Sequence, residues 1–190
     1  MKETRGEEEL VRRMIADDGE AFDLLMERYY PRVLRMAFLI SGSYADSEDI
    51  VQETFVQCYV NRKKIRQPEL FERWLYKTLT REAWRICRRT RREQPVEEVF
   101  GENQPAGPSV LEEVMKSTRD RELYEAVSRL PAKQRTAVVL YYFNGLTTKE
   151  IASVMGCLEG TVKSRLYTAR NQLRQVLSDG REALREEATS

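Results

Sequence analysis

Arginine and tryptophan side chains recur along one predicted helix at spacings that place them on a single face. Wound at about 100° per residue, segment 70–92 separates this face from an apolar stripe. The resulting basic ridge consists of Trp74, Lys77, Arg81, Arg85, Arg88 and Arg92. Positions 81–92 hold six arginines and one glutamate, so the ridge carries one sign of charge. Guanidinium groups bind phosphate and aromatic rings stack on bases, so the pattern favours contact with single-stranded nucleic acid.

A solvated polar face or a membrane-binding face would account for the basic ridge less well. A solvated polar face has no need of two tryptophans, yet Trp84 is also predicted to point outward. A helix that binds acidic membranes would carry tryptophan on its apolar face. Phe71, Leu75, Leu79 and Ile86 form the apolar stripe. Glu82 falls near that stripe, and the pattern offers no role for it.

A second group of residues has the spacing of a helix-turn-helix. Thr147 is followed three positions later by Glu150, a capping-box pattern that begins a short helix. Gly156 permits a left-handed turn after this helix. The small Ala152 and the apolar Val162 lie where two helices must cross. A small residue, a glycine and an apolar residue at these offsets predict a helix-turn-helix.

The helix after this turn has a core side and a polar side. The core side holds Val162, Leu166, Ala169 and Leu173. The polar side holds Ser164, Tyr167, Thr168 and Asn171, flanked by Lys163 and Arg174. Side chains of the polar side can bond to base edges or pack on a thymine methyl. Arg165 and Arg170, at the flanks, suit phosphates, which position a protein on DNA without specifying sequence.

Both groups of residues need helices to hold them, and apolar residues repeat with helical spacing along nearly the whole chain. We predict an all-α fold of two small helical domains, 1–92 and 116–178, the second with the helix-turn-helix. Segment 93–115 between them holds three of the six prolines, two glycines and six acids without a lysine or arginine, which is typical of a linker. A charged tail follows at 179–190.

Apolar spacing also predicts the helices of the N-terminal domain. The first covers about 7–17, and a second covers 22–40, where Pro31 predicts a kink or a restart. Asp46 is the predicted N-cap of a third helix, with Asp49 in the capping-box position. One side of this third helix holds Val51, Phe55 and Cys58. The other side holds Glu48, Gln52, Glu53 and Gln57.

In the C-terminal domain, Pro131 suits the start of a helix that ends at Asn144 and Gly145. The apolar residues of this helix include Val138, Val139 and Tyr142. This helix precedes the short one at 149–155 that begins the helix-turn-helix.

Composition excludes several classes of function. The 190 residues include no histidine, which excludes histidine metal sites, Ser-His-Asp and Cys-His catalysis and imidazole pH sensing. Cys58, Cys87 and Cys157 lie far apart and form neither a CxxC motif nor a disulfide framework, so we expect reduced thiols. No apolar run approaches the ~18 residues of a membrane span, and the N-terminus lacks a signal-peptide core. We therefore predict a soluble, cytoplasmic protein.

Taken together, the motifs resemble those of the extracytoplasmic-function (ECF) class of bacterial RNA polymerase sigma factors. YADSEDIVQETF at 44–55 is similar to the motif of this family that binds core polymerase. FERWLYKTLTREAWRICRRTRR at 71–92 is similar to the segment that reads and opens the −10 promoter element. The segment 130–173, with its GTVKSR string, resembles the module that reads the −35 element.

The resemblance implies a dissociable initiation factor, not an enzyme, without cofactor, metal or small-molecule substrate. Its implied partners are core RNA polymerase, promoter DNA and an anti-sigma factor. The implied polymerase-binding residues are Asp46, Glu48, Asp49, Gln52 and Glu53. The implied −10 residues are Asn61, Arg62, Lys63, Trp74, Lys77, Arg81, Arg85 and Arg88, with the loop 61–70 capturing a flipped base. The implied −35 residues are Lys163, Ser164, Arg165, Tyr167, Thr168, Arg170 and Asn171.

Four positions depart from the family pattern. The family commonly has Asn and Asp where this chain has Arg81 and Arg85, which strengthens the phosphate-binding character of the ridge. Leu158 replaces a usual Ser or Pro, and Thr168 stands where a base-reading Arg is frequent. We therefore expect a shifted −35 preference.

Two alternative functions fit parts of the sequence. A two-domain transcriptional regulator would sense a ligand with its N-terminal half and bind a palindrome as a dimer. A helical adaptor that does not bind DNA would leave the basic ridge without a purpose. Transcription with purified core polymerase separates all three possibilities.

Overall fold

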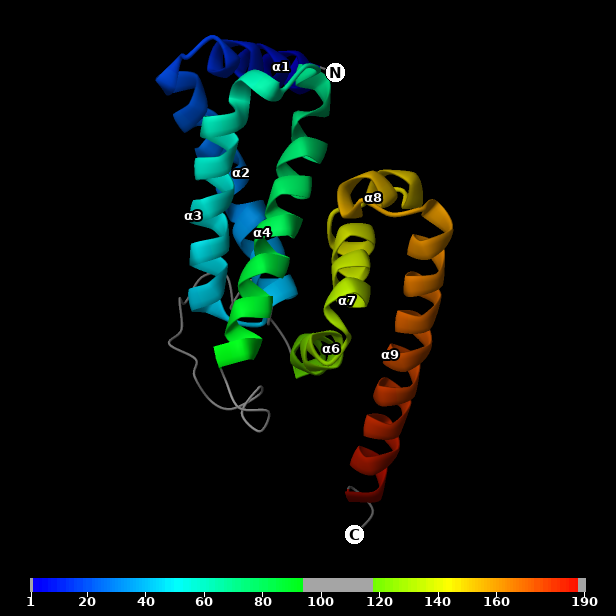
Figure 1. The fold of residues 1–190 in the computed structure, drawn as a ribbon. Helices are drawn as coiled ribbons and strands as arrows, with labels where there is room; N and C mark the ends of the chain where they lie inside the picture. The colour runs from blue at the N-terminus through cyan, green and yellow to red at the C-terminus, as the bar shows by residue number, and fades with distance from the viewer. Residues whose placement is uncertain (1, 94–117, 188–190) are drawn as a thin grey trace. The chain divides into compact units, whose positions relative to one another are not determined.

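The computed structural model describes residues 2–93 and 118–187, which are almost entirely helical and contain no strand, so the all-α prediction is confirmed (Figure 1). The chain divides into two compact units, Met1–Ala106 and Gly107–Ser190, each of which is described by itself. The predicted linker 93–115 lies almost wholly outside the described residues. None of the described helices is long and apolar enough to cross a membrane.

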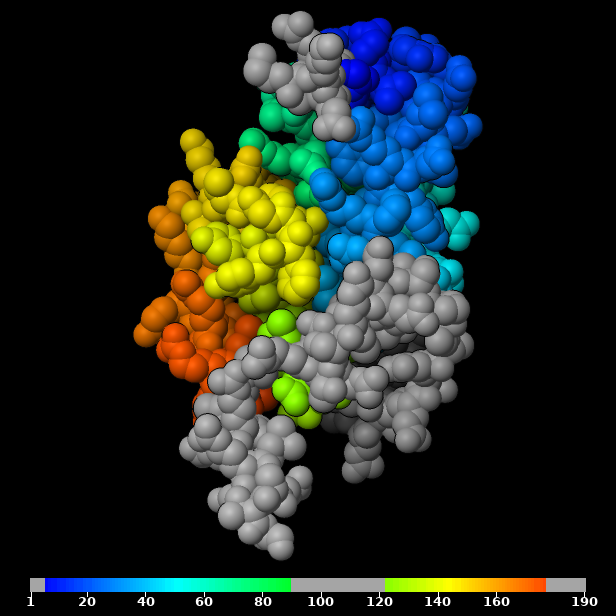
Figure 2. All heavy atoms as spheres, turned by 180° about the vertical axis from the view of Figure 1, so that it is seen from behind, coloured from blue at the N-terminus to red at the C-terminus, as the bar shows by residue number. Residues whose placement is uncertain are grey.

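The described part of the N-terminal unit, residues 2–93, contains four α-helices. They are α1 (Lys2–Ile15), α2 (Gly19–Ser41), α3 (Tyr44–Asn61) and α4 (Phe71–Glu93). The two short 3-10 turns η1 (Arg62–Lys64) and η2 (Pro68–Leu70) connect α3 to α4. Helices α2, α3 and α4 pack on one another, and α1 lies across one end of them (Figure 1). In Figure 2, α1 and α2 form much of the visible surface of this unit, in blue.

Apolar spacing at the helical period explains the core of this unit. Each helix turns one stripe of apolar side chains inward, and burying them is the main favourable term in folding. Fully buried side chains come from all four helices and include Met14, Leu25, Ile50 and Leu75.

Local signals set the helix boundaries, with one correction. Gly42 ends α2 in the left-handed conformation at φ 80°, as its sequence position predicts. Ser43, extended at φ −131°, then caps α3 by accepting a hydrogen bond from the Asp46 amide. The prediction that Asp46 is the N-cap was therefore wrong, because the extended residue directly after the left-handed glycine takes that place.

Helix α2 continues through Pro31 without a restart. Asp18 caps it by accepting a hydrogen bond from the Ala21 amide at 3.2 Å. The break predicted between the first two helices is therefore confirmed.

The C-terminal unit is built around one long helix. Its elements are α6 (Thr118–Ser128), α7 (Ala132–Val138), the π-helical turn η3 (Val139–Phe143), α8 (Thr148–Met155) and α9 (Glu159–Glu187). Helices α6, α7 and α8 all pack against α9. Helix α9 runs on past the predicted domain end at 178.

The π-helical turn changes which side chains face the core. Val138, Val139 and Leu140 are buried, whereas Tyr142 is 53% exposed. Tyr142, although an apolar residue of this helix, faces solvent because a wider turn shifts the residues after it around the helix axis. Tyr141 and Tyr142 instead meet edge to face, with ring centroids 4.9 Å apart.

Candidate nucleic-acid interface

The turn between α8 and α9 has the geometry that the sequence predicts. The Thr147 side chain accepts a hydrogen bond from the Glu150 amide at 3.3 Å, and the Glu150 carboxylate accepts one from the Thr147 amide at 2.9 Å. This reciprocal capping box begins α8. Gly156 ends the helix at φ 63°, a conformation that glycine adopts without steric cost. The predicted helix-turn-helix pattern of Ala152, Gly156 and Val162 is therefore confirmed locally.

Helix α9 separates into the predicted sides. Val162, Leu166 and Ala169 are buried, while Leu173 is only half-buried. The opposite side exposes Ser164, Tyr167, Thr168 and Asn171, and Tyr167 is 65% exposed. This leaves one continuous polar and aromatic face on a rigid helix, which is what a major groove admits.

The charged residues of α9 have partners within the C-terminal unit. The ammonium group of Lys163 pairs with the Glu159 carboxylate at 2.9 Å, and Thr148 of α8 donates to the same carboxylate at 2.8 Å. The hydrogen bond from Lys163 is the main reason that the pKa of Glu159 lies below its usual value. Another anion would therefore have to compete with Glu159 for the Lys163 ammonium group. The sequence did not point to Glu159 as a residue of this site.

The two flanking arginines differ in exposure. Arg165 is half-buried, and its guanidinium donates to the Cys157 sulfur at 3.5 Å. Arg170 is exposed and donates to the Leu166 carbonyl at 3.3 Å. Arg170 is thus open to a phosphate, while Arg165 also packs on the turn that precedes the helix.

On α4, the basic ridge and the apolar stripe separate as predicted. Phe71, Leu75, Leu79 and Ile86 are all buried. Arg81, Arg85 and Arg88 are exposed, Lys77 is half-buried, and the Arg92 side chain lies outside the described residues.

The tryptophans of α4 differ from the prediction that they are exposed. Trp74 and Trp84 are both half-buried. An indole ring is large and amphipathic, so part of it packs on the protein while its edge stays in contact with solvent.

Glu82 has a role that the sequence pattern did not indicate. Its side chain is 15% exposed and accepts a hydrogen bond from the Arg85 guanidinium at 2.6 Å. This bond, followed by the negative charge of Glu82 and then that of Glu53, raises the pKa of Arg85. One charge of the ridge is therefore compensated within the protein, whereas Arg88 donates only to the Trp84 carbonyl at 3.1 Å among the described contacts.

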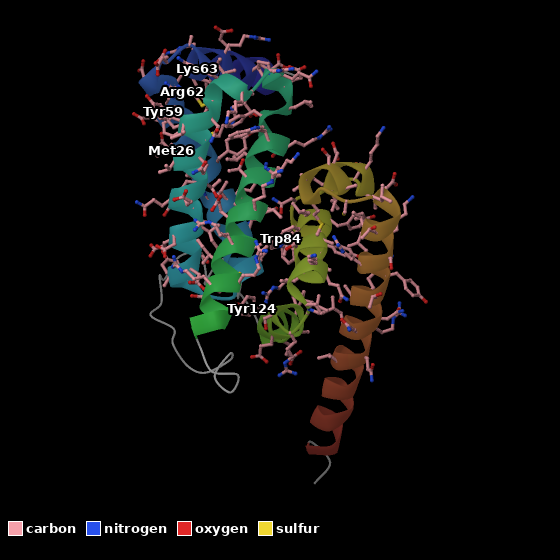
Figure 3. The ribbon with its side chains drawn as sticks, viewed as in Figure 1. Met26, Tyr59, Arg62, Lys63, Trp84 and Tyr124 are labelled. Carbon is pink, nitrogen blue, oxygen red and sulfur yellow. The ribbon has the colours of Figure 1, made fainter. Side chains whose placement is uncertain are left out.

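The three predicted DNA-binding residues of loop 61–70 differ in exposure and in their contacts. Figure 3 labels two of them, Arg62 and Lys63. Lys63 is exposed. Asn61 donates to the Gln57 carbonyl at 2.9 Å. Only 12% of the Arg62 side chain is exposed, because it pairs with Asp17 from the loop between α1 and α2. Sequence reasoning missed Asp17, since nothing local connects it with Arg62.

The acidic side of α3 is exposed as predicted. Glu48, Asp49 and Gln52 are exposed, while Asp46 and Glu53 are half-exposed. The opposite side buries Val51, Phe55 and Cys58, and burial raises the pKa of the Cys58 thiol to about 12. Val56 and Val60 are also exposed, at 47% and 65%, which the sequence interpretation did not include in this face.

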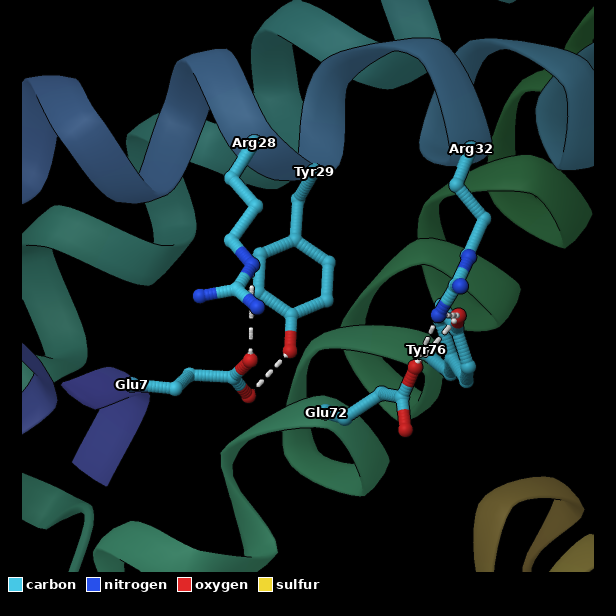
Figure 4. Close-up of polar contacts among 6 residues, drawn as sticks. All are labelled: Glu7, Arg28, Tyr29, Arg32, Glu72 and Tyr76. Carbon is cyan, nitrogen blue, oxygen red and sulfur yellow. Dashed lines mark hydrogen bonds and ion pairs between the residues drawn. The ribbon is translucent and has the colours of Figure 1, made fainter. Parts of the chain in front are cut away.

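Two polar clusters brace the helices that carry these faces (Figure 4). The Tyr29 hydroxyl donates to Glu7 of α1 at 2.5 Å, and Arg28 pairs with the same carboxylate at 3.6 Å. Burial first, then this bond, raises the pKa of Tyr29. The second cluster joins Arg32 of α2 to Glu72 and Tyr76 of α4, with the Tyr76 hydroxyl 2.9 Å from Glu72. These contacts hold the N-terminal end of α4 to the middle of α2.

Comparison with known proteins matches both units to one kind of protein. The family model "Sigma-70 region 2" matches residues 25–93, and "Sigma-70, region 4" matches residues 120–173. The ECF RNA polymerase sigma-E factor of Haemophilus influenzae is 30% identical over 184 residues, covering 91% of this chain and 96% of the relative. The ECF RNA polymerase sigma-E factor of Escherichia coli K12 is 31% identical over 184 residues, covering 91% and 95%.

A solved structure gives a similar match. The sigma factor RpoE from Bartonella quintana, crystallised in complex with the anti-sigma factor NepR, matches with a TM-score of 0.67 and 27% identity. The match covers 83% of this chain and 96% of that one.

Proposed function

The chain belongs to the extracytoplasmic-function RNA polymerase sigma factors, and from that premise we propose how its two units divide the work. It is a sigma factor that binds core RNA polymerase and promoter DNA and directs promoter-specific initiation of transcription. We assign core-polymerase binding and the −10 element to the N-terminal unit and the −35 element to the C-terminal unit. Sigma factors are DNA-binding regulators rather than catalysts, so we propose no chemistry for this chain.

The observation that carries the −35 assignment is the division of α9 into a buried and an exposed side. Ser164, Tyr167 and Thr168 are exposed opposite the buried core residues, directly after a capped helix-turn-helix. We propose that these three residues and Lys163 read base edges in the major groove. Arg165, Arg170 and Asn171 would hold the flanking backbone.

For the −10 element we propose that the ridge of α4 binds the backbone of the displaced strand. The exposure of Arg81, Arg85 and Arg88 supports this role, as do the accessible parts of Trp74 and Lys77. Unstacking a base costs a few kcal/mol, which aromatic stacking and phosphate contacts must offset. Lys63 is exposed in loop 61–70, which directly precedes α4 in the chain. We propose that Lys63 contacts a base flipped from this strand.

We propose that core polymerase docks on the acidic side of α3. Asp46, Glu48, Asp49, Gln52 and Glu53 present carboxylates and amides from one side of a well-packed helix. A basic coiled coil of the largest polymerase subunit would complement this charge.

The ligand-sensing regulator is less well supported. It requires a sensor domain in the N-terminal half, yet a sigma-70 region 2 matches residues 25–93 of that half. Among the described residues, no cluster of three or more His, Cys, Asp or Glu side chains could hold a metal ion.

We further propose that an anti-sigma factor holds the protein inactive, since the Bartonella relative was crystallised with one. We propose that this sigma factor acts in the cytoplasm, because bacterial core polymerase works there.

Run-off transcription with purified core polymerase tests the proposed function. We expect initiation on promoters with a matching −35 and −10 pair only when this protein is added. A double substitution, Ser164→Ala with Tyr167→Ala, should abolish the dependence on the −35 sequence while core binding persists. Specific binding of a palindrome by a dimer without polymerase would favour the regulator instead.

A further inference from the structure

The loop between α1 and α2 lies against the turn that follows α3. Helix α1 packs on both short turns, η1 and η2, of loop 61–70. Within this contact the Asp17 carboxylate accepts a hydrogen bond from the Arg62 guanidinium, 45 residues further along the chain. The Tyr59 hydroxyl donates to the same carboxylate at 3.4 Å. One carboxylate therefore joins the end of α3 to the start of α2.

The Arg62 guanidinium is enclosed on several sides. It donates to the Tyr59 carbonyl at 2.7 Å and lies 4.1 Å from the centre of the Tyr59 ring. That ring packs in turn on Phe22, with centroids 5.0 Å apart. The Nε atom of Arg62 is buried and has no hydrogen-bond partner among the described residues. A guanidinium in this position reaches a phosphate only by giving up its contacts, whereas the next residue, Lys63, is exposed.

The backbone of Asp17 adds an independent observation. Its φ of 76° makes it the one described non-glycine residue in the left-handed region. Asp and Asn adopt this conformation more readily than other side chains, but it persists only where the surroundings hold it. Asp17 lies just after α1 ends at Ile15 and just before Asp18, which caps α2. The chain thus turns from α1 into α2 at the residue that binds Arg62.

We infer that Asp17 and Arg62 form a lock that positions loop 61–70. The inference rests on the proposed role of this loop in −10 recognition. Asp17 is then a positioning residue for promoter opening, although it touches no DNA. Arg62 leaves the set of proposed DNA contacts, and Lys63 remains in it.

Amide exchange in the full-length protein tests the lock directly. Asp17→Asn keeps the side-chain size and the tolerance for the left-handed backbone but removes the charge. The Ile65 amide, which donates to the Arg62 carbonyl at 3.1 Å, reports on the turn. We expect exchange in loop 61–70 to be about three- to tenfold faster, as for loss of one ordinary hydrogen bond, because the asparagine side chain can still accept from Arg62 without the charge. Unchanged exchange would overturn the lock.

Two further variants control this measurement. Asp23→Asn makes the same charge change at an exposed position of α2 and should leave the loop unchanged. Arg62→Gln should accelerate exchange as Asp17→Asn does, and the double variant should add nothing to the larger single effect. Additive acceleration would show that the two residues act separately and would overturn the pairing.

Promoter opening by the holoenzyme separates this inference from the proposed function. Asp17→Asn should lower opening about three- to tenfold without making its salt dependence shallower, because the substitution removes a carboxylate and no cation that meets phosphate. Lys63→Ala should make the salt dependence shallower. Equal changes of salt dependence in both variants would overturn the positioning role. If Lys63→Ala changes nothing while Asp17→Asn still accelerates exchange, the lock stands and the proposed −10 role of the loop fails.

Discussion

Arg85 and Arg88 of α4 allow the proposed contact of the basic ridge with phosphate to be measured one charge at a time. Both side chains are exposed. Arg85 pairs with the Glu82 carboxylate at 2.6 Å, whereas Arg88 donates to the uncharged Trp84 carbonyl. Counterions released from DNA are counted by net positive charge, so Arg88 should contribute more than Arg85.

The expected size follows from counterion release. On a single strand, each neutralised phosphate contributes about 0.7 to the slope of log affinity against log salt. Over the fourfold range from about 50 to 200 mM, one such contact changes affinity about 2.6-fold. Arg88→Ala should therefore make the slope shallower by about 0.7. Arg85→Ala should change it less, and Glu82→Gln should make it steeper because it releases the charge of Arg85.

The assay measures, by fluorescence anisotropy across this salt range, the affinity of the holoenzyme for a labelled single-stranded −10 oligonucleotide. Arg12→Ala on α1 is the matched control, because it removes one exposed arginine away from the ridge. An unchanged slope for Arg88→Ala would refute the contact between ridge and phosphate. Equal slopes for Arg85→Ala and Arg88→Ala would refute the compensation by Glu82.

Four further outcomes are expected. Tyr167→Ala should change the −35 base preference at about 1–3 kcal/mol per lost base contact, scored on a promoter library; an unchanged preference would contradict the proposed orientation of α9. Asp49→Lys combined with Glu53→Lys should abolish co-purification with core polymerase while circular dichroism stays helical, and retained binding would exclude this docking face. Gly156→Ala should lower the free energy of unfolding of the C-terminal unit, measured in urea, by about 1–2 kcal/mol because φ is 63° at this residue. Gly160→Ala, inside α9 with open space at its Cβ, should raise it by about 0.5–1 kcal/mol. Equal effects of the two substitutions would contradict the role of the left-handed turn. Folding lowers the pKa of Glu159, so the stability that Glu159 contributes is present above its usual pKa and is lost as pH falls through its pKa in the folded protein. Glu159→Gln should therefore flatten this part of the acid unfolding curve. An unaltered curve would show that the Glu159–Lys163 interaction does not stabilise the fold.

Features that depend on a few neighbouring residues could be predicted from the sequence. The capping box of Thr147 and Glu150 spans four residues, and Gly156 needs only its own backbone freedom. Helical periodicity likewise identified the buried stripe of α4 and the two sides of α9, because each helix repeats the same geometry along its length.

Features that depend on a second element could not be predicted in the same way. Asp17 and Arg62 are 45 residues apart and meet only after α1, α2 and α3 have packed. Tyr142 faces outward in a π-helical turn, which breaks the helical period and which apolar spacing alone does not indicate. Ser43 is the N-cap of α3, although other polar residues nearby could also cap a helix. The left-handed Gly42 that ends α2 leaves Ser43 extended in the capping position.

The net charge of +1 sums 32 Lys and Arg against 31 Asp and Glu, and some of these opposite charges pair at the proposed DNA-binding faces. Three cations that the sequence assigned to DNA carry a carboxylate partner in the protein, in the pairs Arg62–Asp17, Arg85–Glu82 and Lys163–Glu159. Each partner reduces the charge offered to phosphate, so the chain alone should bind DNA with a weaker dependence on salt than its number of basic residues suggests. Core polymerase, docked on the acidic side of α3, would then supply much of the electrostatic attraction that the holoenzyme has for a promoter. On this argument the carboxylates favour DNA binding by the assembled enzyme over binding by the isolated factor.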